Sequence, residues 1–294
     1  MSETTSADRA TGLARRAWIV WSLAAVVAAL STDNPVYRGL VTLAALDVLL
    51  TWLPRGRSLR RLGAAVAFSA LFAVLVNVVV SHTGADVLFR IPDAIPVFGG
   101  PVTVESVAFG VTVGLGLTAA LVAVAPLSLI LESHDIVDAL PRPLERTGIA
   151  LATAMNLVSG FGRTFASVRD AQRMRGWRPR GIRSWNEVMV PVVLTAIEDS
   201  VLLAEAMESR GFGAGPRTSF ASHRWRLWDV AVCATSVVAA TLFIVLRFAG
   251  APVDWYPYPT LALPEVNPIL VAACLALALP AFAPPAPQVR EPVR

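Results

Sequence analysis

Lysine is absent from this chain of 294 residues, and all 25 of its basic residues are arginine. A P-loop needs a lysine after its glycine-rich turn to reach the phosphates of a nucleotide, so ATP hydrolysis by that route is excluded. Histidine is scarce, and His82, His134 and His223 form no His-Glu-x-x-His or Cys/His cluster for zinc. Nothing resembles a serine nucleophile elbow either. We therefore expect no enzyme activity, cofactor or metal site in this chain.

Only two cysteines occur, Cys233 and Cys274, and both fall inside long apolar segments. Cysteines in such segments are more often small packing residues than a disulfide or a metal-binding pair. They therefore do not indicate a redox compartment.

Charged side chains make up only 16% of the residues, against 55% hydrophobic ones, and the mean hydropathy is +0.61. This apolar balance exceeds that of an ordinary soluble domain and indicates a membrane protein. A helix needs roughly 20 mostly apolar residues to cross about 30 Å of hydrocarbon. Six segments are candidates for such spans: 17–31, 37–53, 62–81, 104–131, 227–249 and 267–283.

The first apolar segment is the weakest of the six candidates. Because Arg15 and Arg16 precede it, it could also be the hydrophobic part of a signal peptide, although no clear small-residue cleavage site follows. We expect a short span there. The predicted fold is an all-α integral membrane protein with about four spans in residues 1–131 and a helix pair in 227–283. A disordered proline-rich tail is expected over 284–294.

The arginines are unevenly placed, and the positive-inside rule converts their placement into a topology. Three precede the first span, four lie between the second and third, thirteen run from Arg142 to Arg226, and two end the chain. Only Arg38, Arg90 and Arg247 fall on the other side, so both termini are expected in the cytoplasm. The net charge of +4 follows from this placement, and no groove of stacking aromatics indicates a nucleic-acid partner.

Residues 132–226 predict a cytoplasmic region with two long amphipathic helices, from about Arg146 to Gly176 and from about Trp185 to Gly211. A basic turn from Trp177 to Gly181 joins them. Apolar residues recur along one face of the second helix, at steps of four and three. These residues are Val190, Leu194, Ile197, Val201 and Ala204. Neither segment is apolar all round, so neither is predicted to span the membrane.

Both amphipathic helices end in an arginine followed by a glycine, at Arg175-Gly176 and Arg210-Gly211. Gly176 and Gly211 are predicted to cap the helices in the left-handed conformation, where the preceding arginine complements the helix dipole. Capping does not explain why two such ends should stand together on one side of a membrane. An arginine is also suited to a bidentate pair with a carboxylate of another protein. From the residues alone, both roles stay open.

The stretch from about Leu127 to Ser219 resembles the transmembrane T component of energy-coupling factor (ECF) type transporters. These are ATP-driven importers of vitamins and transition-metal ions in prokaryotes. That family ends two cytoplasmic coupling helices with Ala-Arg-Gly, which here correspond to Met174-Arg175-Gly176 and Ser209-Arg210-Gly211. Both triplets depart from the family at the first position. The flanking residues that also match are Asp170-Ala171-Gln172, Pro191, Glu205-Ala206-Met207-Glu208, Phe212 and Arg217-Thr218.

The resemblance implies a multi-pass protein of a prokaryotic inner (plasma) membrane that couples partner ATPases to transport. Two ABC-type ATPase subunits would bind ATP and magnesium, and a membrane substrate-binding S component would pack against this chain. The residues implied in ATPase docking are Arg173, Met174, Arg175, Gly176, Glu208, Ser209, Arg210 and Gly211. Small residues would let the two coupling helices cross closely, although they could also be ordinary packing residues. They include Ala150, Ala154, Ser159 and Gly160.

Two alternatives compete with this interpretation. In a self-contained secondary transporter or channel, Asp47 and Asn77 would line the path, but no pair of broken spans suggests an inverted repeat. A structural or snorkelled role for Asp47 is the simpler interpretation. In a membrane scaffold without transport, the Arg-Gly ends would bind a partner other than an ATPase. The cargo is not encoded here, because in the resembling family a different polypeptide binds it.

Overall fold

The computed structural model describes residues 13–53, 56–81, 83–91, 99–131, 145–178, 181–212 and 225–284. The chain divides into two compact units, which we call the bundle unit and the arm unit. The bundle unit comprises Met1–Ile136 and Arg224–Arg294, and the arm unit comprises Val137–His223. The predicted tail beyond residue 284 lies outside the described residues.

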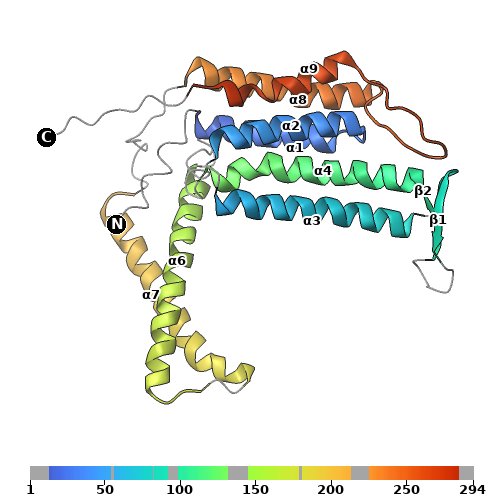
Figure 1. The fold of residues 1–294 in the computed structure, drawn as a ribbon. Helices are drawn as coiled ribbons and strands as arrows, with labels where there is room; N and C mark the ends of the chain where they lie inside the picture. The colour runs from blue at the N-terminus through green and yellow to red at the C-terminus, as the bar shows by residue number, and fades with distance from the viewer. Residues whose placement is uncertain are drawn as a thin grey trace. The chain divides into compact units, whose positions relative to one another are not determined.

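The bundle unit contains helices in all six of the predicted apolar segments (Figure 1). They are α1 (Arg15–Leu30), α2 (Pro35–Trp52), α3 (Arg57–Val80), α4 (Val104–Leu129), α8 (Leu227–Phe248) and α9 (Pro268–Ala276), which continues into the 3-10 helix η3 (Leu279–Phe282). Among the described residues, four helices are long and apolar enough to cross a membrane: α2, α3, α4 and α8. Helix α1 has 16 residues, which gives about 24 Å at 1.5 Å per residue. It is therefore shorter than the hydrocarbon layer.

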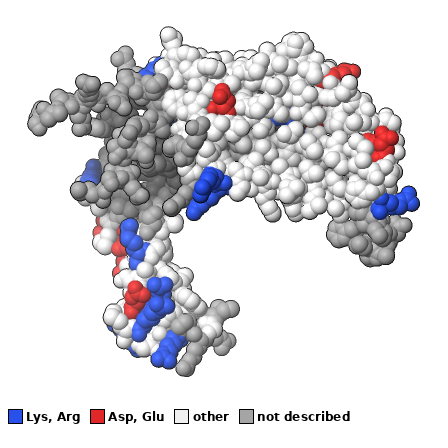
Figure 2. Space-filling model, in the orientation of Figure 1, with Lys and Arg blue, Asp and Glu red and all other residues white. Residues whose placement is uncertain are grey.

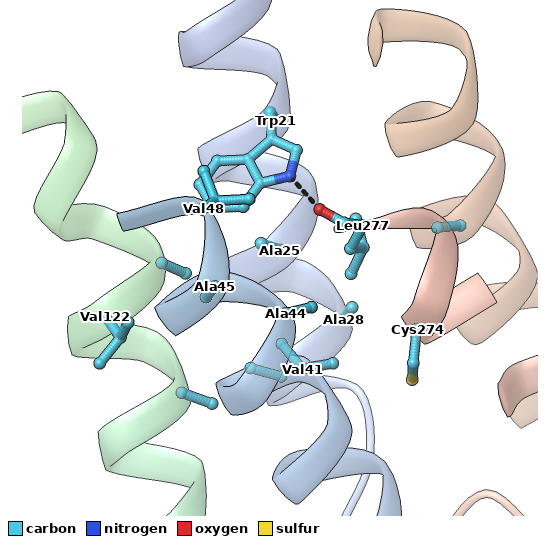
Figure 3. Close-up of a cluster of buried hydrophobic side chains, with 14 of the residues drawn as sticks. Trp21, Ala25, Ala28, Val41, Ala44, Ala45, Val48, Val122, Cys274 and Leu277 are labelled. Atoms are coloured by element: carbon cyan, nitrogen blue, oxygen red, sulfur yellow. Dashed lines mark hydrogen bonds between the residues drawn. The ribbon is translucent and has the colours of Figure 1, made fainter. Parts of the chain in front are cut away.

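Helix α1 nevertheless packs in the centre of the bundle rather than beside it. Trp18 and Trp21 are fully buried, and the indole N–H of Trp21 donates to the carbonyl of Leu277 at 2.8 Å (Figure 3). The indole N–H of Trp52 donates to the carbonyl of Pro280 in the same way, at 2.9 Å. Ala25 and Ala28 of α1 and Ala44 and Ala45 of α2 are buried in the same cluster as Trp21, and such small side chains let helices approach closely. The first apolar segment is therefore part of the bundle core.

Glycines set the contact between α3 and α4. An added Cβ at Gly110 would lie 3.1 Å from the Cα of Val74, and one at Gly114 would lie 3.1 Å from the carbonyl oxygen of Ala70. A real Cβ at these distances would be tighter than most, so the two glycines let the backbones approach closely. The opposite face of α3 is exposed, with Phe68 and Leu71 each about 70% accessible.

A β-hairpin, which the all-α prediction did not include, joins α3 to α4. Strands β1 (Val87–Ile91) and β2 (Gly100–Thr103) pair antiparallel. Glu105, in the first turn of α4, is fully buried and accepts the backbone N–H groups of Ala85 and Asp86 at 3.1 and 3.2 Å. This carboxylate ties the start of the hairpin to α4. We call this end of the bundle the hairpin end.

Two ion pairs lie at the hairpin end. They involve two of the three arginines that the predicted topology places on the side of the membrane opposite the termini. Arg38 bonds Asp33 at 2.7 Å and donates to the carbonyl of Thr112 at 2.9 Å. Arg247 pairs with Asp254 at 3.3 Å. The neighbouring carboxylates neutralise these charges, which explains how arginines are accommodated there.

Candidate docking site at two helix ends

The arm unit is built from two crossing helices, α6 (Glu145–Met174) and α7 (Asn186–Ser209), with the 3-10 turn η2 (Ile182–Trp185) before α7 (Figure 1). Both begin and end within two residues of the amphipathic helices predicted from the sequence. A small apolar cluster holds them together. Trp177, Val188 and Val192 are buried in it, and Phe165 and Val168 pack against it.

The C-terminal end of α6 closes in a Schellman motif. Gly176 has a φ of +86° and donates its N–H to the carbonyl of Arg173 at 3.0 Å. The N–H of Trp177 reaches back to the carbonyl of Gln172 at 2.9 Å. These two bonds satisfy carbonyls that would otherwise have no partner. The predicted left-handed glycine cap is confirmed here.

The C-terminal end of α7 repeats the same motif. Gly211 has a φ of +74° and donates to the carbonyl of Glu208 at 2.8 Å, while Phe212 donates to Met207 at 3.0 Å. The second predicted cap is therefore confirmed as well. Gly250, after α8, has a φ of +75° in a cap of the same kind, so the cap alone does not identify a docking site. What distinguishes the arm ends is the side chains beside each glycine.

All eight residues implied in docking are exposed: Arg173, Met174, Arg175, Gly176, Glu208, Ser209, Arg210 and Gly211. In the described part of the chain, the guanidinium groups of Arg175 and Arg210 form no ion pair or hydrogen bond. Each can therefore bind an acceptor of another molecule without breaking an internal bond. Figure 2 shows several basic side chains, with some acidic ones, close together on the arm, whereas the visible face of the bundle is mostly uncharged and has only separate charged side chains.

Aromatic packing supports the end of α6, a feature that sequence reasoning missed. Trp177 is only 9% exposed, and its indole N–H donates to the carbonyl of Ser184 at 3.0 Å. Trp185 packs edge-on against Trp177 and stacks on Phe165. A large apolar residue directly after a capping glycine was the available signal, because it often packs back on its helix. Phe212, the equivalent residue after α7, is 54% exposed.

Of the four small residues predicted at the helix crossing, the structure describes the surroundings of Ala150, Ala154 and Gly160. Ala150 and Ala154 are exposed, and an added Cβ at Gly160 would meet nothing within 4 Å. The side chain of Ser159 lies outside the described residues. Among the described residues of this set, none is seen to make the contact between α6 and α7. Larger side chains make that contact, nearer to the Arg-Gly end of α6.

The apolar face predicted on α7 is uncovered in the arm unit. Val190, Leu194, Ile197 and Val201 are each 52–56% exposed, whereas the residues that pack toward α6 are Val188 and Val192. Helix α7 thus has one apolar strip that contacts α6 and a second that contacts no described part of the arm. Such a strip is suited to lipid or to another apolar helix.

Asp47 and Asn77, the residues considered for a transport path, are not brought together. Asp47 is exposed near the C-terminal end of α2, and Asn77 lies near the C-terminal end of α3. Because α2 and α3 run in opposite directions, these positions are at opposite ends of the bundle (Figure 1). The amide of Asn77 donates to the carbonyl of Ala73 on its own helix, at 2.9 Å.

Comparison with known proteins adds two similarities. Residues 10–220 match the model of the CbiQ family, described as cobalt transport protein. The chain is also 24% identical over 162 residues to the energy-coupling factor transporter transmembrane protein EcfT of Staphylococcus aureus (strain 04-02981). That alignment covers 48% of this chain and 60% of the relative, so the chain spans about three fifths of the length of that protein.

Proposed function

This chain belongs to the CbiQ family of cobalt transport proteins, and from that premise we propose that it is the transmembrane coupling subunit of an ATP-driven ECF-type importer. Two ABC-type ATPase subunits bind ATP and magnesium and each receives one Arg-Gly end. A separate S component binds the cargo in the membrane. The name of the Staphylococcus aureus relative, an energy-coupling factor transporter transmembrane protein, supports this assignment.

One observation carries the proposal: the same capped, exposed arginine recurs at the ends of two crossing helices. The cap fixes the backbone, so each guanidinium projects from a defined position. A bidentate bond to a carboxylate of the ATPase then has a low ordering cost. Truncating one partner of a charged pair at a desolvated interface costs about 2–5 kcal/mol. Two such contacts suit a chain that must stay attached while its partners move.

The helix pair also has the rigidity that force transmission requires. Helix α7 has 24 residues, which gives about 36 Å of continuous helix. When two ATPases close on ATP, the distance between the docked ends changes. The aromatic and valine cluster at Trp177, Val188 and Val192 then serves as the pivot about which α6 and α7 change their crossing angle. That change of angle drives the S component to reorient.

The experiment is co-purification of the chain with its ATPases from native membranes. We expect the wild-type protein to retain two ATPase subunits, and the double variant Arg175→Ala/Arg210→Ala to insert normally and retain none. The matched control is Arg163→Ala/Arg178→Ala, which removes two exposed arginines from the same arm and should retain both subunits. Retention of both ATPases by Arg175→Ala/Arg210→Ala would contradict the docking assignment.

The cargo is a vitamin or a transition-metal ion, bound by the S component. The family description names cobalt, so Co²⁺ is the first cargo to test. Vesicles that contain the complete complex should accumulate Co²⁺ only when ATP is enclosed inside them. Vesicles that hold this chain alone should accumulate none, and uptake by the chain alone would instead support a self-contained transporter.

A further inference from the structure

The arm unit is inserted in the bundle unit, between α4 and α8. Both of its connections therefore join the bundle at the end where α4 stops and α8 begins, which we call the arm end. Helix α1 begins at this end too (Figure 1). Because the chain is continuous, a displacement of the arm can reach the bundle through these two connections. The residues around the start of α8 are described by the structure.

Asp229 is the third residue of α8 and is fully buried. One of its carboxylate oxygens accepts the backbone N–H of Arg226 at 2.8 Å, in the N-terminal cap of its own helix. The other accepts the backbone N–H of Ala14 at 2.6 Å. Ala14 is the N-cap residue of α1 and has no capping side chain of its own. One buried carboxylate thus caps two helices that are 215 residues apart in the sequence.

Only a carboxylate can make both contacts well. Its two oxygens accept separate N–H groups, and its negative charge is stabilised by the positive ends of two helix dipoles. An asparagine has the same shape but a single carbonyl oxygen, so its NH₂ group would face one of the two backbone donors. The change from aspartate to asparagine therefore sets an NH₂ group against one of the two N–H donors and weakens the cap that the helices share, while it preserves side-chain volume.

We propose that Asp229 is a positioning residue that transmits movement of the arm connection to α1. This inference rests on the proposed function, because it requires ATPases that move the arm. Arg226 is the N-cap residue of α8 and lies three residues after the end of the arm unit at His223, so a displacement there moves the start of α8. The carboxylate of Asp229 makes α1 move with α8. From α1, the bond of Trp21 to Leu277 carries the movement on to the segment between α9 and η3.

The test is hydrogen–deuterium exchange on the complex of this chain with its ATPases, with and without ATP. In the wild type, ATP should change the exchange of the first turns of both α8 and α1. In Asp229→Asn, the response of α8 should persist and that of α1 should be lost. Glu105→Gln is the matched control, because Glu105 is also a buried first-turn carboxylate that accepts two backbone N–H groups, but at the hairpin end. It should leave both responses intact.

A purely structural cap would behave differently. Asp229→Asn would then raise exchange in the first turn of α1 with and without ATP alike, and the ATP-dependent difference would remain. That result would overturn the inference, as would a wild-type complex in which α1 does not respond to ATP. Absence of ATPases from the wild-type preparation would overturn the proposed function, and this inference with it.

Discussion

Gly176 and Gly211 hold the same left-handed backbone, with φ of +86° and +74°, at equivalent positions of two helix ends. Among the residues that the structure describes, none has an atom within 4 Å of a Cβ built on either glycine. A side chain there would therefore meet no clash, and its only cost would be the backbone conformation itself. Substitution of these glycines therefore tests the backbone conformation of the docking ends without adding a steric clash.

Substitution of either glycine by alanine should weaken ATPase binding. A non-glycine residue in the left-handed region costs roughly 1–2 kcal/mol, and the cap relaxes to avoid that cost. The adjacent Arg175 or Arg210 then loses its fixed direction. Titration of each variant with purified ATPase should show about a tenfold loss of affinity, which corresponds to 1.4 kcal/mol.

Gly250→Ala is the control for these two variants. Gly250 has a φ of +75° and open space around a built Cβ, but it ends α8 in the bundle unit. Its substitution should lower the thermal stability of the chain by a similar free energy and leave ATPase affinity unchanged. An equal loss of affinity in Gly250→Ala would show that general destabilisation, rather than the cap at the arm ends, weakens docking.

Replacement of Arg175 and Arg210 by lysine should restore only part of the binding that alanine removes. Lysine keeps the positive charge but not the planar fork that makes two parallel bonds to a carboxylate. We expect the lysine variants to have affinities between those of the wild type and the alanine variants, with a steeper loss as salt is added. The affinity of each variant for surface-immobilised ATPase can be measured over a series of salt concentrations. Full affinity in the lysine variants would exclude bidentate pairing.

The sequence predicted the helices and caps because local patterns encode them. Apolar runs, amphipathic spacing and terminal glycines depend on neighbouring residues, and α6 and α7 begin and end close to the predicted positions. Features that depend on residues distant in the sequence were not predictable. The bond between the carboxylate of Asp229 and the backbone of Ala14 joins residues 215 positions apart, so no local pattern indicates it.

The hairpin and the helix crossing illustrate the same limit. Strands β1 and β2 are short and lie between two long apolar spans, so their pairing left no clear alternation in the sequence. On α6, small residues such as Ala154 suggested a close approach, but the contact with α7 is made by Phe165 and its neighbours. Helix propensity and residue size do not determine which face meets a partner.

The two ion pairs at the hairpin end should differ in their contribution to stability. Asp33 bonds Arg38, whose side chain is only 10% exposed, so Asp33→Asn leaves a buried guanidinium without its carboxylate. We expect a loss of about 2 kcal/mol, in the range for a hydrogen bond to a charged group. Asp254→Asn breaks a pair in which both side chains are at least 40% exposed, and should cost less than about 1 kcal/mol. Thermal unfolding in detergent measures both, and equal losses would show that burial of Arg38 does not set the difference.

The contact between α3 and α4 should depend on the absence of side chains at Gly110 and Gly114. A methyl group at Gly110 would approach the backbone of Val74 to 3.1 Å, and a backbone cannot turn aside as a flexible side chain can. Gly110→Ala/Gly114→Ala should therefore force α3 away from α4 and lower stability by about 1–3 kcal/mol, the usual cost of overpacking. Gly63 lies in α3, and no described atom lies within 4 Å of a Cβ built there. Gly63→Ala should raise stability by about 0.5–1 kcal/mol, because alanine orders a helix at a lower entropic cost than glycine does. Unfolding curves in one detergent compare these variants. A double variant as stable as Gly63→Ala would mean that close backbone packing does not hold α3 in place.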